Sequence, residues 1–125
     1  MKMKYLLDTV IIIDHLNGIK QATEWLSRLK EGEGAISVIT RAEVLVGIDG
    51  PEKPHILLFL DMYPCLGINQ ETADKTAELR KQYKWKLPDA FQAGLAVINK
   101  LILVTRNTRD FKTDVHDFVL IPYMI

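Results

Sequence analysis

Residues 88–104 read PDAFQAGLAVINKLILV, and the fold class follows from them. Proline is favoured in the first turn of a helix, so Pro88 predicts a helix that runs to about Lys100. This helix is apolar nearly all round, which is typical of a helix covered on every side. It leads directly into 101–104, an apolar run of strand length, as in strands with both faces covered. A buried helix next to a buried strand predicts a sheet enclosed by helices.

The alternation of short apolar runs with helical patterns continues on both sides of this stretch. Strands are predicted at residues 5–7, 35–39, 65–68 and 118–121, the last at an edge because Pro122 cannot donate to a ladder. One helix is predicted at 19–29, and a second begins near Thr40, where Thr40 and Glu43 form a capping box. A third is predicted at 70–83, with Ala73 and Ala77 inward and Tyr83 as a further candidate. The pattern favours an α/β, three-layer fold, in which helices flank a mainly parallel sheet of four to five strands, as one domain of residues 1–125.

The composition fits a compact domain and excludes several classes of protein. Of 125 residues, 48% are hydrophobic and 26% are charged, and no apolar run approaches the roughly 18 residues of a membrane span. Cys65 is the one cysteine, so an internal disulfide is impossible and a cytoplasmic location is expected. Sixteen basic and sixteen acidic side chains give a formal net charge of zero. Any case for nucleic-acid binding must therefore come from a local site.

Polar side chains cluster where the predicted strands end. Ligands of open parallel sheets bind beyond the carboxyl ends of the strands, and the candidates there are Asp8, Glu43, Asp89, Thr105, Asn107 and Asp110. Each acid has a structural explanation when taken singly. Asp8 would cap the helix that follows it, and Glu43 would complete a capping box with Thr40. Asp89 would be stabilised by the macrodipole at the start of its helix. A surface ion pair with Arg106 or Arg109 would account for Asp110.

Together, the four acids favour a metal site. Carboxylates that converge on one cleft repel each other unless a divalent cation neutralises them. An all-oxygen donor set suits Mg²⁺ or Mn²⁺, and such ions promote phosphodiester hydrolysis. Basic side chains near the site form two clusters, Arg80, Lys81, Lys84 and Lys86, and Arg106, Arg109 and Lys112. A basic rim would hold a polyanion such as RNA, although a solvated helix face explains the first cluster equally well.

Four segments carry a further pattern: LLDT at 6–9, TRAEVLVG at 40–47, LPDA at 87–90 and VTRNTRDF at 104–111. In this order and register they resemble PIN-domain ribonucleases, and most of all the VapC-type toxins of toxin–antitoxin pairs. The resemblance covers nearly the whole chain. It implies Mg²⁺- or Mn²⁺-dependent endonucleolytic cleavage of RNA, inhibition by a cognate antitoxin, and homodimerisation.

The resemblance also implies roles for single residues. Asp8 and Asp89 match the principal metal-binding acids, and Glu43 matches the third. Thr105 matches the residue that helps orient the metal-bound water. Asn107 stands where many relatives have an acid, so either Asp110 takes over as the fourth acid or the site holds a single ion.

Two other positions depart from the family pattern. Val10 stands where the family usually has Asn or Ser, which removes a polar partner behind the metal ligands. Gln92 stands where an apolar residue is more usual. Neither change removes a carboxylate, so an active site is expected, with weakened activity as the alternative.

Other classes of protein remain open at this point. A PIN-like module that has lost catalysis, and acts by dimerisation or regulator binding, would have nearly the same sequence. A receiver-type signalling domain would need an acid on the third strand, where 65–68 offers none. For the dimer, the helix predicted at 53–62 has more apolar surface than a small core needs, with burial in its own core as the alternative.

Overall fold

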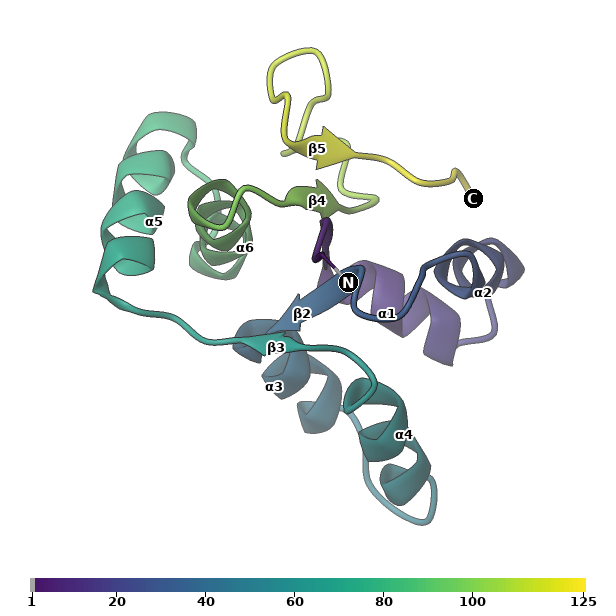
Figure 1. The fold of residues 1–125 in the computed structure, drawn as a ribbon. Helices are drawn as coiled ribbons and strands as arrows, with labels where there is room; N and C mark the ends of the chain where they lie inside the picture. The colour runs from purple at the N-terminus through teal and green to yellow at the C-terminus, as the bar shows by residue number, and fades with distance from the viewer. Residues whose placement is uncertain (1) are drawn as a thin grey trace.

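Five short strands form one sheet in the computed structural model, which describes residues 2–125 (Figure 1). β1 (Tyr5–Leu7) lies at the centre, between β2 (Gly34–Ser37) and β4 (Ile102–Val104). The edges are β3 (Cys65–Leu66) beside β2, and β5 (Val119–Leu120) beside β4. All four pairings are parallel. The α/β class, the parallel sheet and the edge position of the last strand are therefore confirmed.

Helices connect the first four strands, as expected from the sequence. Within the described residues these are α1 (Thr9–Leu16), α2 (Lys20–Ser27), α3 (Val38–Val46), α4 (Lys53–Leu60), α5 (Gln70–Tyr83) and α6 (Leu87–Ile98). Pro88 lies in the first turn of α6, where its missing N–H costs nothing. No helix formed by residues 2–125 is both long and apolar enough to cross a membrane.

The sheet separates two apolar layers. Successive side chains of a strand alternate in direction, so Leu6 and Leu7 of β1 point to opposite faces, and both are fully buried. Leu6 packs in a cluster with Ala93 of α6, whereas Leu7 packs in a cluster with Ile11 of α1. Figure 1 shows α5 and α6 on one side of the sheet and α1 and α2 on the other. This topology places the first turns of α1, α3 and α6 at the carboxyl ends of the strands.

The start of α3 differs from the prediction. The strand expected over 35–39 ends at Ser37, which is the N-cap of α3 and accepts a hydrogen bond from the Thr40 backbone N–H over 3.0 Å. Thr40 lies inside the helix, fully buried. The side chains of Thr40 and Glu43 bond to residues of other elements, so the predicted capping box is wrong.

The buried face of α5 differs in part from the prediction, although Tyr83 packs against the core cluster and Ala73 is half-buried. Ala77 is exposed, and Thr72 and Thr76 are buried instead. The two helices approach closely at Gly94, where a Cβ would lie 2.4 Å from Thr76 Oγ1. Within residues 2–125, this hydroxyl has no hydrogen-bond partner. The contact therefore depends on a residue without a side chain on α6 and a compact threonine on α5.

Gly94→Ala is expected to lower the free energy of unfolding by about 1–2 kcal/mol, although alanine is intrinsically favoured over glycine in helices. The added methyl group would collide with Thr76 Oγ1. Adding Thr76→Ala should restore most of the lost stability, because it removes both the colliding atom and a buried, unpaired hydroxyl. Chemical denaturation of the two variants checks this. A Gly94→Ala protein as stable as the wild type would contradict the close approach of the helices.

Candidate functional site

A pocket of about 430 Å³ lies where β1 and β4 end and α1, α3 and α6 begin. Its lining consists of Asp8, Thr9, Val10, Ile13, Glu43, Asp89, Arg106 and Asn107. Three of the four acids singled out from the sequence, together with Asn107, therefore share one pocket. Thr105 and Asp110 are not among the lining residues. We call this space the acidic pocket.

Asp8 is the most firmly held of these acids. It is the N-cap of α1 and only 7% exposed. Its Oδ1 accepts from the Thr9 backbone N–H at 2.9 Å and from Gln92 Nε2 at 3.1 Å, and its Oδ2 accepts from Thr105 Oγ1 at 2.7 Å. Burial raises the pKa of Asp8, hydrogen bonds from Thr105, Gln92 and Thr9 oppose the rise, and the charge of Glu43 adds to it. The carboxylate thus has a fixed orientation.

Asp89 lies in the first turn of α6, and its surroundings favour the protonated form. Partial burial raises its pKa to about 6, with further contributions from the negative charges of Asp8, Asp110 and Glu43. The positive charge of Lys86 acts in the opposite direction. Burial is the larger cause of the raised pKa, and the charges of the other three carboxyl groups further disfavour the ionisation of Asp89 in the metal-free protein.

Glu43 projects from α3 towards α1 and remains exposed. Its Oε1 accepts a hydrogen bond from Thr9 Oγ1 over 2.6 Å. Thr9 and Glu43 are 34 positions apart, so this bond joins the helix after β1 to the helix after β2.

The loop after β4 is built by reciprocal hydrogen bonds. Asn107 Nδ2 donates to Asp110 Oδ2 at 3.0 Å, and the Asp110 backbone N–H donates to Asn107 Oδ1 at 3.2 Å. The Asn107 backbone N–H donates to Thr105 Oγ1 at 3.1 Å, and buried Trp85 donates from Nε1 to the Asp110 carbonyl at 3.0 Å. Asp110 is therefore bonded within its own loop, while its charge still reaches Asp89.

An ion pair at one side of the pocket was not expected. Arg106 donates to Asp14 twice, from Nε at 2.6 Å and from Nη2 at 2.9 Å, and Tyr123 donates to the same carboxylate at 2.9 Å. These hydrogen bonds, the one from Arg106 first, hold the pKa of Asp14 below its usual value despite burial. Because Arg106 pairs with Asp14, it does not supply the surface ion pair offered as one structural explanation of Asp110. Arg106 and Tyr123 lie 92 and 109 positions from Asp14, and no local pattern joins them.

A second unexpected group connects Asp8 with Glu43. Gln92 Nε2 donates to Asp8 and to Thr40 Oγ1, and Thr40 Oγ1 lies 2.8 Å from Thr9 Oγ1. The sequence contains one signal for it, because Gln92 is an amide within an otherwise apolar stretch of α6.

The donor set of the acidic pocket fits a hard divalent cation. Among residues 2–125, no three His, Cys, Asp or Glu side chains are already gathered closely enough to hold a metal ion. The chemistry of the lining is nevertheless suitable, since Asp8, Glu43, Asp89 and Asn107 supply oxygen atoms of the kind that Mg²⁺ and Mn²⁺ prefer. A cation would also offset the neighbouring negative charges that, together with burial, raise the pKa of Asp89.

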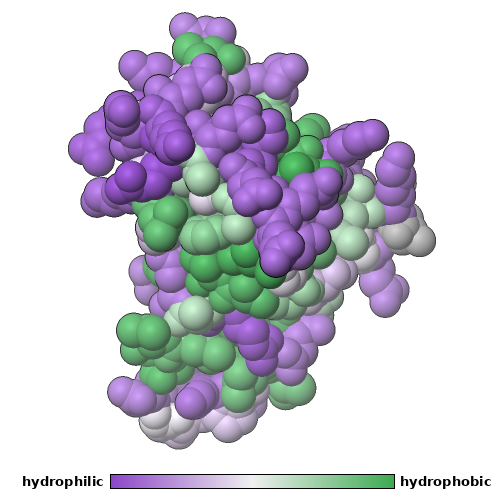
Figure 2. Space-filling view, turned by 90° about the vertical axis from the view of Figure 1, so that its left-hand side faces the viewer, coloured by the Kyte–Doolittle hydropathy of each residue, from purple (hydrophilic) through white to green (hydrophobic). Residues whose placement is uncertain are grey.

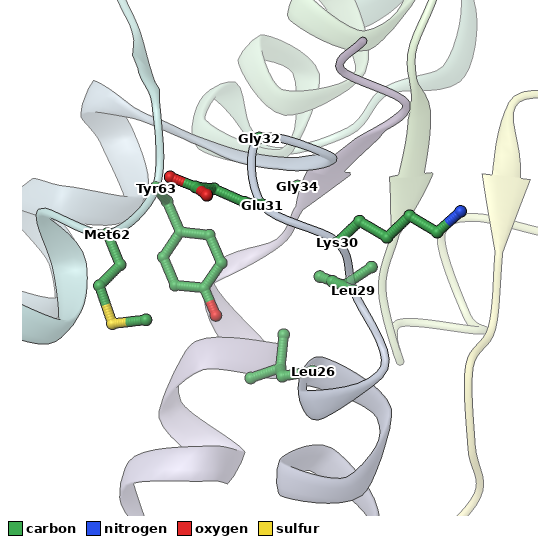
Figure 3. Close-up of a pocket in the computed structure, with 8 residues that line it drawn as sticks. All are labelled: Leu26, Leu29, Lys30, Glu31, Gly32, Gly34, Met62 and Tyr63. Carbon is green, nitrogen blue, oxygen red and sulfur yellow. The ribbon is translucent and has the colours of Figure 1, made fainter. Parts of the chain in front are cut away.

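A second pocket, also about 430 Å³, lies at the amino end of β2, away from the acids. Figure 3 shows Leu26, Leu29 and the ring of Tyr63 around this space, with Met62 beside them. Its lining contains a single carboxylate, that of Glu31. Volume therefore does not distinguish the two pockets, but only the acidic pocket has side chains suited to metal binding.

Comparisons with known proteins agree with the fold and with the family resemblance of the sequence. In a toxin-antitoxin complex from Klebsiella pneumoniae, a chain with 36% identity is matched with a TM-score of 0.85, over 98% of this chain and 100% of that one. FitAcB from Neisseria gonorrhoeae shows 25% identity and a TM-score of 0.80, over 97% and 99% of the two chains. Ribonuclease VapC10 of Mycobacterium tuberculosis is 29% identical over 112 residues, which cover 85% of this chain and 84% of that protein. Because the PIN domain matches residues 5–114, the chain belongs to the PIN domain family.

Proposed function

We propose that this protein is a Mg²⁺- or Mn²⁺-dependent endoribonuclease, and the VapC-like toxin of a toxin–antitoxin pair. The observation that carries the proposal is the convergence of Asp8, Glu43 and Asp89 on one pocket at the carboxyl ends of the strands. The likeness to ribonuclease VapC10 and to chains of toxin–antitoxin complexes supports the same activity.

In this proposal Asp8, Asp89 and Glu43 hold the divalent ion. When bound, the ion supplies Lewis-acid stabilisation of the negative charge on the phosphodiester. Thr105 acts through Asp8, since its hydroxyl proton is donated to that carboxylate. Asn107 adds an amide to the pocket, and Asp110 contributes as a more distant negative charge.

Basic side chains beside the acids would hold the RNA. Arg106 is one of the residues that line the acidic pocket, and its partner Asp14 fixes the orientation of its guanidinium. Lys86 lies close enough to Asp89 to lower the pKa of that acid. In the proposal both cations would contact phosphate groups of the RNA. They would allow a chain of zero net charge to bind a polyanion.

The proposal includes an antitoxin partner and a homodimer. The antitoxin is supported by the toxin–antitoxin complexes among the structural relatives, such as VapBC from Salmonella typhimurium. The homodimer is supported by exposed apolar side chains on α3 and around α4, where Val46 is 87%, Leu58 68% and Met62 72% exposed. Figure 2 shows hydrophobic groups in the lower part of the molecule, where Figure 1 places α3 and α4, beneath a largely hydrophilic upper surface. Light scattering at micromolar concentration would then give about twice 14.3 kDa.

The proposed activity is tested by incubating the purified protein with single-stranded RNA. We expect cleavage in the presence of Mn²⁺, its loss on addition of EDTA, and its return with excess Mn²⁺. Asp8→Asn should cleave at least about a hundredfold more slowly, whereas the matched change Asp74→Asn, at an exposed position of α5, should have no effect. Cleavage that survives EDTA would contradict metal dependence. A wild type that never cleaves would favour the non-catalytic module.

A further inference from the structure

Gln92 has an unusual environment for a long polar side chain. It lies on α6 one turn after Asp89, is 1% exposed, and is surrounded along the helix by buried Ala90, Ala93 and Leu95. Within residues 2–125, its Oε1 has no hydrogen-bond partner. A leucine would fill a similar space without a buried, unpaired carbonyl, so packing alone does not account for the amide.

The amide nitrogen of Gln92 has two acceptors, and their chemistry sets its orientation. Nε2 lies 3.1 Å from Asp8 Oδ1 and 2.7 Å from Thr40 Oγ1. An ionised carboxylate only accepts hydrogen bonds, so the group facing Asp8 must be the NH₂ and not the carbonyl. One amide hydrogen therefore goes to Asp8 and the other to Thr40.

The same reasoning gives a direction to the rest of the chain of hydrogen bonds. Glu43 Oε1 accepts from Thr9 Oγ1 at 2.6 Å, so the hydroxyl proton of Thr9 is committed to Glu43. At the 2.8 Å contact between the two threonines, Thr9 must then accept and Thr40 must donate. The order is Gln92 to Thr40, Thr40 to Thr9 and Thr9 to Glu43.

From this arrangement we infer that Gln92 is a positioning residue of the acidic pocket, orienting Asp8 directly and Glu43 through Thr40 and Thr9. The inference rests on the proposed function, since it assigns Gln92 to the metal-binding acids named there. One side chain on α6, which also carries Asp89, thereby links carboxylates that follow β1 and β2. Without it, the repelling carboxylates of Asp8 and Glu43 would lose their common support.

The test compares Gln92→Leu with the wild type in Mn²⁺ binding, measured by calorimetry, and in thermal melting. We expect Mn²⁺ affinity to fall by about 10–100-fold, as for other residues that orient metal ligands, with a melting temperature that is unchanged or higher. Thr40→Val interrupts the chain to Glu43 but leaves the bond between Gln92 and Asp8, so it should have a smaller effect. The double variant should bind no more weakly than Gln92→Leu, because both changes interrupt one chain. Gln82→Leu, at an exposed position of α5, is the matched control and should bind as the wild type does.

Two outcomes separate a failure of this inference from a failure of the proposed function. Wild-type Mn²⁺ affinity in Gln92→Leu, or a loss of affinity matched by a large fall in melting temperature, would overturn the positioning role. If the wild type itself binds no Mn²⁺, the proposed function fails, and the crystal structure of metal-free Gln92→Leu decides the inference. A Glu43 carboxylate that has left Thr9 supports it, and one that remains in place overturns it.

Discussion

Asp89→Asn should abolish RNA cleavage and at the same time stabilise the metal-free protein at neutral pH. Loss of one carboxylate from the proposed ligand set should slow cleavage by more than roughly a hundredfold, since changes to residues that merely support metal ligands cost about 10–100-fold. Asparagine has nearly the same shape as aspartate, so the packing of the first turn of α6 is preserved. The loss of activity would therefore come from the missing charge.

The gain in stability follows from the direction of the pKa shift. The pKa of Asp89 is raised from 3.8 to about 6 in the folded protein, by burial and by the neighbouring carboxylates. The folded state therefore binds this proton more tightly than the unfolded state, and the wild type loses stability as pH rises from about 4 to above 6. Asparagine carries no charge at any pH, so the variant should melt at a higher temperature at pH 7–8.

Thermal melts in EDTA between pH 4 and pH 8 check this result. The difference between Asp89→Asn and the wild type should shrink as the pH falls below about 6, because the wild-type carboxyl group then takes up a proton. A variant that melts at a lower temperature throughout this range would show that Asp89 serves chiefly to stabilise the start of α6. Retained cleavage would contradict its place in the ligand set.

Asp14→Asn should have the opposite effect on stability, and a larger one. Asp14 is 6% exposed and accepts two hydrogen bonds from Arg106 and one from Tyr123, which together join α1 to the loop after β4 and to the segment after β5. Loss of this charge leaves Arg106 without its counter-ion and weakens all three bonds. We expect the free energy of unfolding at pH 7 to fall by about 2–4 kcal/mol.

The pH dependence of Asp14→Asn distinguishes it from Asp89→Asn. Because the pKa of Asp14 is lowered in the folded protein, its stabilising contribution is present above the ordinary value of 3.8 and disappears as pH falls through the folded value. Denaturation at pH 7 and at pH 3 should therefore show a deficit that narrows at the lower pH. Tyr123→Phe, which removes one of the three bonds, should cost only about 1 kcal/mol. An unchanged stability of Asp14→Asn at pH 7 would mean that water replaces the ion pair without loss.

Much of the fold could be predicted because it depends on local patterns. The apolar runs at 5–7 and 101–104 correspond to adjacent strands of the sheet, and Pro88 marks the first turn of a buried helix. The start of α3 could not be predicted in this way, because Ser37 and Thr40 are both plausible N-caps in the sequence. Long-range hydrogen bonds decide between the two residues, because the Thr40 side chain bonds to residues 31 and 52 positions away and is therefore not free to cap the helix.

In the candidate site, too, local sequence patterns could be predicted and long-range contacts could not. Asp8, Glu43 and Asp89 could be grouped from the sequence because each follows a strand or begins a helix at the same edge of a parallel sheet. The residues that hold these acids in place could not be predicted from the sequence, because the partners of Asp8 include Gln92 and Thr105, which are 84 and 97 positions away. Gln92 was visible as an odd residue in an apolar helix, but only the folded chain shows which groups its amide contacts.

The central claim is that Asp8, Glu43 and Asp89 together bind one catalytic divalent ion, and calorimetric titration with Mn²⁺ tests it most directly. The wild type should bind Mn²⁺, and Asp8→Asn, Glu43→Gln and Asp89→Asn should each weaken binding by at least about tenfold, while Asp74→Asn should not. Wild-type Mn²⁺ affinity in all three variants would contradict the claim, as would a wild-type protein that cleaves RNA without binding the ion.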